Sequence, residues 1–123
     1  MTQSPFFIVV AIVTGLFGLG FLFMPDSVLT WYGATTDDAG RLMSRVFGSA
    51  AIGLAVIYFM ARDLGAGQAL TGLLWAGLII SILDLILAVI ATTGDVMNAL
   101  GWGQALLHIL LGAGFGYFAF VKR

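Results

Sequence analysis

Four long stretches of the chain carry very few charged side chains, and polar stretches separate them. They cover residues 5–24, 41–61, 69–92 and 101–121. Each stretch has the length of about 20 residues that a helix needs to cross the hydrocarbon core of a bilayer. Their apolar residues run on without the strict alternation of a strand, which favours helices. The pattern predicts an all-α integral membrane protein, a single domain of four transmembrane helices packed as a bundle.

The long connection between the first two predicted helices, residues 25–40, has features of its own. Trp31 and Tyr32 within it suit the headgroup region of a membrane. Residues 26–29 fit a short interfacial helix, and a simple loop with aromatic anchors fits equally well. Residues 35–38, Thr-Thr-Asp-Asp, offer N-cap side chains to the second long helix.

Composition agrees with a membrane protein and excludes several kinds of chemistry. The chain has 123 residues, 61% of them hydrophobic and 9% charged, whereas about 25% of residues are charged in a soluble domain. A net charge of −1 gives no sign of a nucleic-acid partner. The absence of cysteine excludes disulfides and thiolate metal sites. Residues 2–4 lack the basic region of a signal peptide, so we expect the first stretch to be retained.

The distribution of Lys and Arg predicts an orientation. Arg62, Lys122 and Arg123 flank one set of helix ends, whereas Arg41 and Arg45 lie toward the other. Cytoplasmic loops carry the excess of basic residues, so we expect both termini on the cytoplasmic side. We expect this membrane to be the cytoplasmic (inner) membrane of a bacterium.

The main candidate for chemistry is Asp84, the only charged residue between residues 73 and 91. A charge at such depth costs several kcal/mol unless it is paired, protonated or hydrated. Helical rise places Arg45, Gln104 and His108 in the same half of the membrane as Asp84. We therefore predict a polar intramembrane cluster in which Arg45 pairs with Asp84, and Gln104 and His108 complete the network. The alternative is that this cluster only fixes the register of the helices.

Small residues accompany these polar groups on one face of each predicted helix. On the third helix the face of Asp84 holds small and polar side chains, and a row of isoleucines lies opposite. Close helix packing favours such small residues. The candidate packing residues are Gly48, Gly53, Gly112 and Gly116. Their spacing suits packing within the chain and packing against a partner helix equally well.

His108 is a further hypothesis, as an axial ligand of haem or of a chlorin. A single histidine excludes two-histidine haem ligation within one chain, although Ala105 and Gly112 would let a flat ring approach. A hydrogen-bonded interior histidine is the favoured interpretation, so we expect no cofactor, while a lipid or quinone ligand stays open. No metal site and no arrangement of nucleophile, base and orienting group is recognisable.

The layout resembles the DoxX-like group of small four-helix membrane proteins. Residues 15–20 followed by Met24-Pro25, and Gly40-Arg41 through Arg45 to Gly53, carry the resemblance. It implies a companion of quinone-linked or redox membrane assemblies, and it transfers no catalytic residue.

The function we expect is that of a non-catalytic accessory subunit, with the bilayer and other membrane proteins as partners. The first alternative is a carrier or binder of a small amphipathic molecule at the polar cluster. The second is a pigment- or haem-binding subunit.

Overall fold

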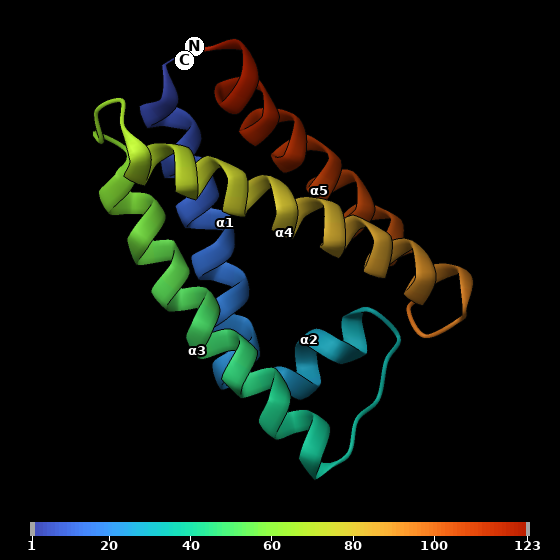
Figure 1. Ribbon diagram of the computed structural model, residues 1–123. Helices are drawn as coiled ribbons and strands as arrows, with labels where there is room; N and C mark the ends of the chain where they lie inside the picture. The colour runs from blue at the N-terminus through green and yellow to red at the C-terminus, as the bar shows by residue number, and fades with distance from the viewer. Residues whose placement is uncertain (1, 123) are drawn as a thin grey trace. The chain divides into compact units, whose positions relative to one another are not determined.

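The computed structural model describes residues 2–122, which form helices and turns with no strand in that range. The helices are α1 (Gln3–Phe23), α2 (Pro25–Trp31), α3 (Asp38–Ala61), α4 (Gln68–Thr93) and α5 (Leu100–Gly116), and α5 continues into a π-helical turn, η1 (Tyr117–Val121) (Figure 1). Four helices, with α5 and η1 taken together, are long and apolar enough to cross a membrane. Each predicted span therefore coincides with a helix that is long and apolar enough to cross a membrane, and each helix begins one to three residues before its predicted start.

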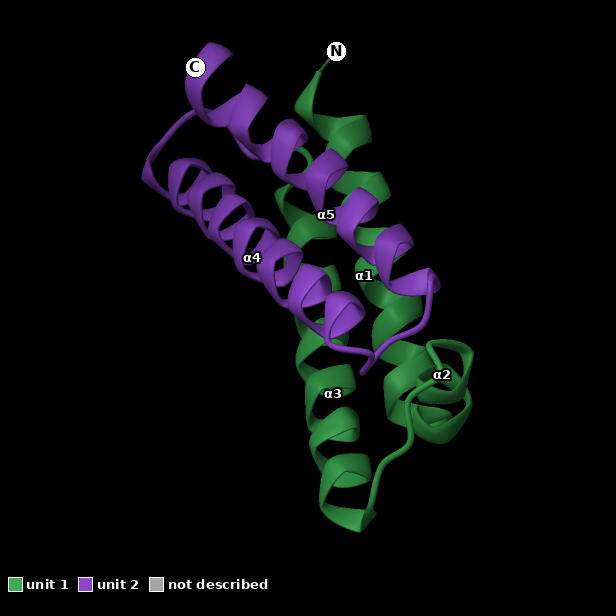
Figure 2. Cartoon of the chain, turned by 90° about the vertical axis from the view of Figure 1, so that its right-hand side faces the viewer, with its two compact units in different colours: residues 1–63 green, residues 64–123 purple. Residues whose placement is uncertain are grey.

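The chain divides into two compact units, unit 1 (residues 1–63) and unit 2 (residues 64–123), which Figure 2 colours separately. Unit 1 contains α1, α2 and α3, and unit 2 contains α4, α5 and η1. The prediction of one bundle of four helices concerns both units together and stays a prediction.

In unit 1 the backbones of α1 and α3 touch at two glycines. A Cβ atom added to Gly48 would lie 2.6 Å from the backbone nitrogen of Leu22 and 2.7 Å from the carbonyl oxygen of Gly18. Further along the same face of α3, Ala51 and Ala55 are buried. Small residues at this spacing allow two helices to approach closely in a membrane, so the sequence explains why α1 packs against α3.

A short helix, α2, forms in the long connection as predicted, and its place at the membrane interface stays a prediction. Pro25 occupies the first turn of α2, where its missing N–H costs no hydrogen bond. Arg41 in the first turn of α3 donates from Nε to both carboxylate oxygens of Asp26, at 3.1 and 3.0 Å. Arg41 also pairs with Asp38. These contacts attach α2 to the beginning of α3.

The beginning of α3 is capped by Asp37, whose carboxylate accepts a hydrogen bond of 2.8 Å from the backbone N–H of Gly40. This satisfies one of the backbone donors that the first helical turn leaves free. The prediction of a cap within residues 35–38 is confirmed.

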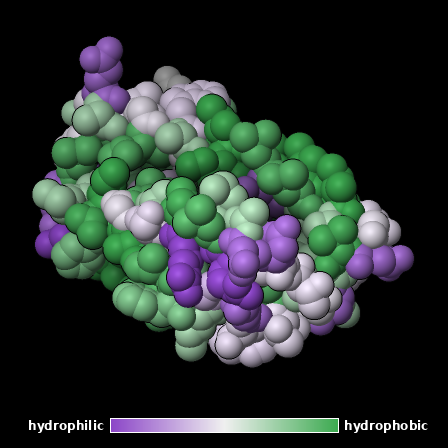
Figure 3. Space-filling view, turned by 90° about the horizontal axis from the view of Figure 1, so that it is seen from below, coloured by the Kyte–Doolittle hydropathy of each residue, from purple (hydrophilic) through white to green (hydrophobic). Residues whose placement is uncertain are grey.

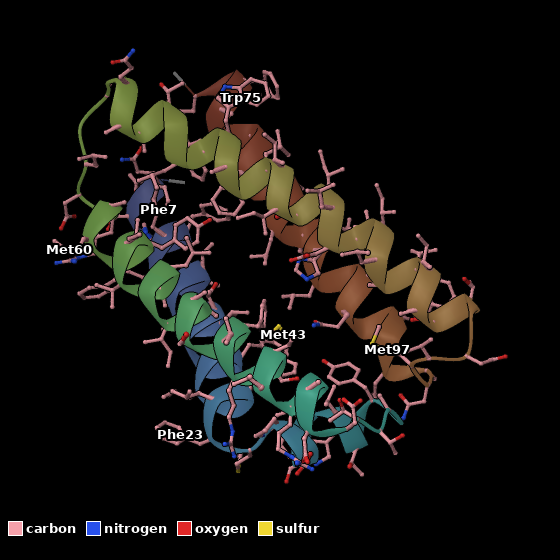
Figure 4. All side chains as sticks on the ribbon, turned by 60° about the horizontal axis from the view of Figure 1, so that its bottom comes forward. Phe7, Phe23, Met43, Met60, Trp75 and Met97 are labelled. Atoms are coloured by element: carbon pink, nitrogen blue, oxygen red, sulfur yellow. The ribbon has the colours of Figure 1, made fainter. Side chains whose placement is uncertain are left out.

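In unit 2, α4 and α5 pack through small residues against an aromatic ring. The ring of Phe115, which is almost fully buried, occupies the space beside Gly77 that a side chain would fill. The ring of Trp75 on α4 packs edge to face against the ring of Phe120 in η1, with the ring centroids 5.0 Å apart. Trp75 is labelled in Figure 4.

The two faces of α4 differ as the sequence predicts. The small residues Gly77, Ser81 and Ala88 are buried. An apolar ridge on the other side is exposed, and it consists of Ile79, Ile82, Leu83, Ile86 and Ile90.

Candidate functional site: an intramembrane carboxylate and imidazole

Asp84 on α4 and His108 on α5 lie side by side within unit 2. The distance from His108 Nε2 to Asp84 Oδ2 is 3.9 Å. This is too long for a direct hydrogen bond, but it is close enough for a strong charge interaction when the imidazole is protonated. The His108 side chain is 15% exposed and the Asp84 side chain 39% exposed. The carboxylate is therefore the more accessible of the two groups.

Small neighbours bring these two side chains together. One helical turn before Asp84, Ser81 is buried and its hydroxyl donates a 2.8 Å hydrogen bond to the carbonyl of Gly77. The hydroxyl is thus satisfied within α4 and needs no partner on α5. One turn after His108, a Cβ atom on Gly112 would lie 3.4 Å from the Cβ atom of Ser81. The helices approach closely at this point, which places the imidazole beside the carboxylate.

The second ring nitrogen of His108 gives the site its unusual character. Nδ1 is buried and has no hydrogen-bond partner among residues 2–122. A buried polar atom without a partner costs about 1–3 kcal/mol. The imidazole therefore has unused hydrogen-bonding capacity inside a membrane-spanning helix.

The other two residues of the predicted cluster have no side-chain partner within the described part of their own units. Gln104 is half-buried on α5, one turn before His108, and its side chain forms no hydrogen bond within the described part of unit 2. Arg45 is exposed on α3 and forms neither a hydrogen bond nor an ion pair within the described part of unit 1. Arg45 and Asp84 belong to different units, so their pairing stays a prediction.

Arg45 differs in this respect from the other arginines of unit 1. Arg41 pairs with Asp26 and Asp38, and Arg62 pairs with Asp63 at 3.2 Å. Because a guanidinium inside a membrane-spanning helix requires an acceptor, Arg45 needs one from outside unit 1.

The predicted packing glycines have different surroundings. Gly48 contacts α1, as described above, and Gly112 lies against Ser81. A Cβ atom on Gly116 would be 3.9 Å from Leu78, which is an ordinary contact. Gly53 is exposed with no atom within 4 Å of its Cβ position. Packing at Gly53 against another surface stays a prediction.

The donor set limits what the site can hold. Among residues 2–122, no group of three or more His, Asp or Glu side chains is arranged to hold a metal ion. A haem or chlorin bound through Nε2 of His108 would have to share the space that the carboxylate of Asp84 occupies. The pair can instead exchange a proton, or offer a hydrogen-bond acceptor and donor to a polar group at membrane depth.

Sequence reasoning missed a second feature, an open groove in unit 1 between α1 and α2. It is a cavity of about 560 Å³ lined by Leu16, Phe17, Leu19, Gly20, Phe23, Met24, Val28, Trp31 and Tyr32. Burial at its edge raises the pKa of the Tyr32 phenol. The spacing of Val28, Trp31 and Tyr32 on one face of a short helix was the available signal.

Comparison with known proteins assigns no family to the chain. No protein-family model, no curated protein and no solved structure matches it. The four apolar helices and the pair of Asp84 and His108 define a class, an integral membrane protein with a carboxylate and an imidazole side by side within its spanning helices.

Proposed function

We propose that the chain is a non-catalytic membrane protein that serves as an accessory subunit of a larger membrane assembly. The observation that carries the proposal is the apolar surface that its spanning helices leave uncovered. Only 17–28% of each spanning window is buried, so most of every helix is available to lipid or to neighbouring helices. The two short connections, residues 62–67 and 94–99, leave no room between the helices for a soluble catalytic domain.

Two sequence features support the proposal and extend it. The DoxX-like resemblance points to a redox or quinone-linked assembly. The basic residues Arg62, Lys122 and Arg123 favour termini on the cytoplasmic side of a bacterial inner membrane, although Arg123 lies outside the described residues. The arrangement as a single bundle, with Arg45 of unit 1 as an additional partner of Asp84, belongs to the same proposal.

Site-directed photocrosslinking in native membranes tests the accessory role. A benzophenone amino acid replaces Ile86, on the exposed ridge of α4, or Ala66, in the polar turn between the units. We expect the Ile86 probe to give a crosslink to one particular membrane protein, because it faces away from α5. The Ala66 probe should not reproduce that crosslink. Crosslinks to lipid alone from ridge probes at Ile86, Leu83 and Ile79 would contradict the proposal.

The second candidate function is the binding of a small amphipathic molecule. The observation that favours it is the buried Nδ1 atom of His108, which has no partner among residues 2–122, while Nε2 of the same ring lies 3.9 Å from the accessible carboxylate of Asp84. A ligand with a carbonyl or hydroxyl group at the end of an apolar tail would supply the missing hydrogen bond. Such a molecule would reach the pair through the membrane.

Binding measurements with a short-tailed quinone test this second candidate. We expect the affinity of the purified protein to change between about pH 5 and 8, the range in which imidazoles titrate. His108→Gln should remove that pH dependence because glutamine does not titrate. Gly53→Ala, at an exposed position of α3, serves as the control and should behave like the parent protein. Affinity that is constant over this pH range in the parent protein would exclude a role for His108 in binding the quinone.

A further inference from the structure

Only one of the two ring nitrogens of His108 lies near a charge. Nε2 is 3.9 Å from a carboxylate oxygen of Asp84, whereas Nδ1 is buried and has no partner among residues 2–122. Asp84 is the only charged side chain of α4, and His108 is the only titratable side chain of α5. Tyr117 in η1 follows nine residues later, roughly 13 Å along the helix. Within unit 2, the carboxylate of Asp84 is therefore the charge that distinguishes the two nitrogens.

An ionised carboxylate decides which nitrogen of a neutral imidazole carries the hydrogen. A neutral imidazole has one N–H donor and one bare acceptor nitrogen, whereas an ionised carboxylate can only accept. An N–H directed at the carboxylate is attracted to it, and a bare nitrogen in the same place is repelled. This attraction acts at 3.9 Å without a hydrogen bond, because the His108 side chain is only 15% exposed and water screens it poorly. Pairing of Arg45 with the same carboxylate, as predicted, would keep Asp84 ionised.

The bare nitrogen sets the kind of group that a ligand must bring. With the hydrogen on Nε2, Nδ1 of His108 is a buried acceptor without a donor. A hydroxyl group can donate to it, whereas a carbonyl oxygen, itself an acceptor, would leave both atoms unpaired. Protonation of the ring reverses this, because both nitrogens of an imidazolium donate. The neutral imidazole is therefore complementary to a hydroxyl.

The surface around Asp84 suits a ligand with an apolar body. The Asp84 side chain is 39% exposed, and Ile80 and Leu87, about one helical turn before and after it, are exposed as well. In Figure 3, hydrophobic side chains cover much of the visible surface, around a patch of hydrophilic ones. A molecule that approaches this carboxylate from the lipid therefore meets apolar side chains before it reaches the pair.

We propose that Asp84 holds neutral His108 as the Nε2–H tautomer, so that the pair binds an apolar molecule through a hydroxyl group in preference to a carbonyl group. This rests on the second candidate function, the binding of a small amphipathic molecule, and it names the ligand class. The hydroxyl donates to Nδ1, and the apolar body lies along the exposed side chains of α4. Asp84 is a positioning residue here, because it acts on the ligand through the imidazole.

Nitrogen-15 NMR of the full chain in detergent tests the tautomer directly. His108 is the only histidine, so histidine labelling gives the resonances of one imidazole. Above about pH 8, the upper end of the range in which imidazoles titrate, we expect an N–H resonance from Nε2 and a bare-nitrogen resonance from Nδ1. Asp84→Asn should give a mixture of both tautomers, because its amide offers an NH2 donor as well as an oxygen. A hydrogen on Nδ1 in the parent protein would overturn the proposal.

Asp95→Asn is the matched control for the charge. Asp95 is the other aspartate of unit 2, and it is exposed in the turn between α4 and α5. Its backbone has a φ of 59°, a conformation in which asparagine is enriched, so the substitution removes a carboxylate without strain. This variant should keep the tautomer of the parent protein. A parent-like tautomer in Asp84→Asn, or the same mixture in both variants, would overturn the positioning role of Asp84.

A matched pair of ligands tests the preference for a hydroxyl. The probes are a long-chain secondary alcohol and the ketone with the same carbon skeleton, and equilibrium dialysis above about pH 8 measures their binding. We expect the alcohol to bind about tenfold more tightly, the ratio that one hydrogen bond to a buried group supplies. His108→Phe, which has a ring without an acceptor, should bind both probes equally. In Asp84→Asn the preference should shrink, because only part of the protein has a bare Nδ1.

The outcomes separate the ligand class from the function on which it rests. Equal binding of the two probes by the parent protein, or tighter binding of the ketone, would overturn the preference for a hydroxyl and leave the binding of amphipathic molecules standing. Binding of neither probe would overturn the binding function and the preference together. A full preference for the alcohol in Asp84→Asn would show that His108 selects the ligand without Asp84, which contradicts the proposal.

Discussion

Gly48→Ala is expected to lower the free energy of unfolding in detergent by about 3 kcal/mol. Overpacking a well-packed contact costs about 1–3 kcal/mol, and the clash at Gly48 lies at the upper end because both neighbours are backbone atoms. The added methyl group would lie 2.6 Å from the nitrogen of Leu22 and 2.7 Å from the oxygen of Gly18. No rotation of a side chain can relieve such contacts, so α1 and α3 must move apart.

Gly53→Ala provides the matched control on the same helix. Its added methyl group meets no atom within 4 Å, and alanine favours a helix over glycine by about 1 kcal/mol. The unfolding temperature of Gly53→Ala should therefore equal or exceed that of the parent protein. Equal unfolding temperatures for the Gly48 and Gly53 variants would show that α1 and α3 do not approach each other at Gly48.

The second large effect is expected at Asp84 and His108, where a double-mutant cycle should give a coupling free energy of about 1 kcal/mol. Polar side chains that interact across helices in a membrane couple by about 0.6 kcal/mol on average and up to about 1.7. The atoms are 3.9 Å apart, too far for a hydrogen bond, but the 15% exposure of the His108 side chain limits screening of the charge interaction. Asp84→Asn, His108→Gln and the double variant, unfolded in detergent at a pH where the histidine is protonated, give the measurement.

A second cycle decides whether Arg45 also holds Asp84. If the guanidinium of Arg45 pairs with the carboxylate of Asp84, the cycle of Arg45→Gln and Asp84→Asn should give a coupling free energy of similar size. If Asp84→Asn and Arg45→Gln both leave the unfolding temperature unchanged, the predicted pairing of Arg45 with Asp84 is wrong. Coupling of Asp84 to His108 alone would confine the site to unit 2.

The spans and caps could be predicted because each depends on a local pattern. Helix length and continuous apolar residues determine a membrane span, and Asp37 lies where a capping carboxylate reaches the first turn of α3. The two faces of α4 follow from the helical period. Ser81 and Ala88 fall on the buried side, and Ile86 falls on the exposed side.

The partners of the polar groups were harder to predict because they depend on how helices pack. Helical spacing gives the face of a residue but not which other face it meets. The predicted cluster included His108, and its imidazole lies near Asp84 within unit 2. The pairing of Asp84 with Arg45 stays a prediction. The groove was missed as well, since the apolar face of α2 was readable from the sequence but its position beside the end of α1 was not.

The position of Asp84 has a consequence for the order in which the chain enters the membrane. Synthesis proceeds from the N-terminus, so α4 reaches the bilayer ahead of α5, which carries His108. A central aspartate disfavours insertion by about 3 kcal/mol, while each leucine or isoleucine favours it by about 0.5 kcal/mol. The mean hydropathy of the α4 window is 2.6, against 1.6 for the window of α5 and η1. Helix α4, which must insert with the carboxylate of Asp84 before its neighbour α5 is in place, is thus the more apolar of the two helices.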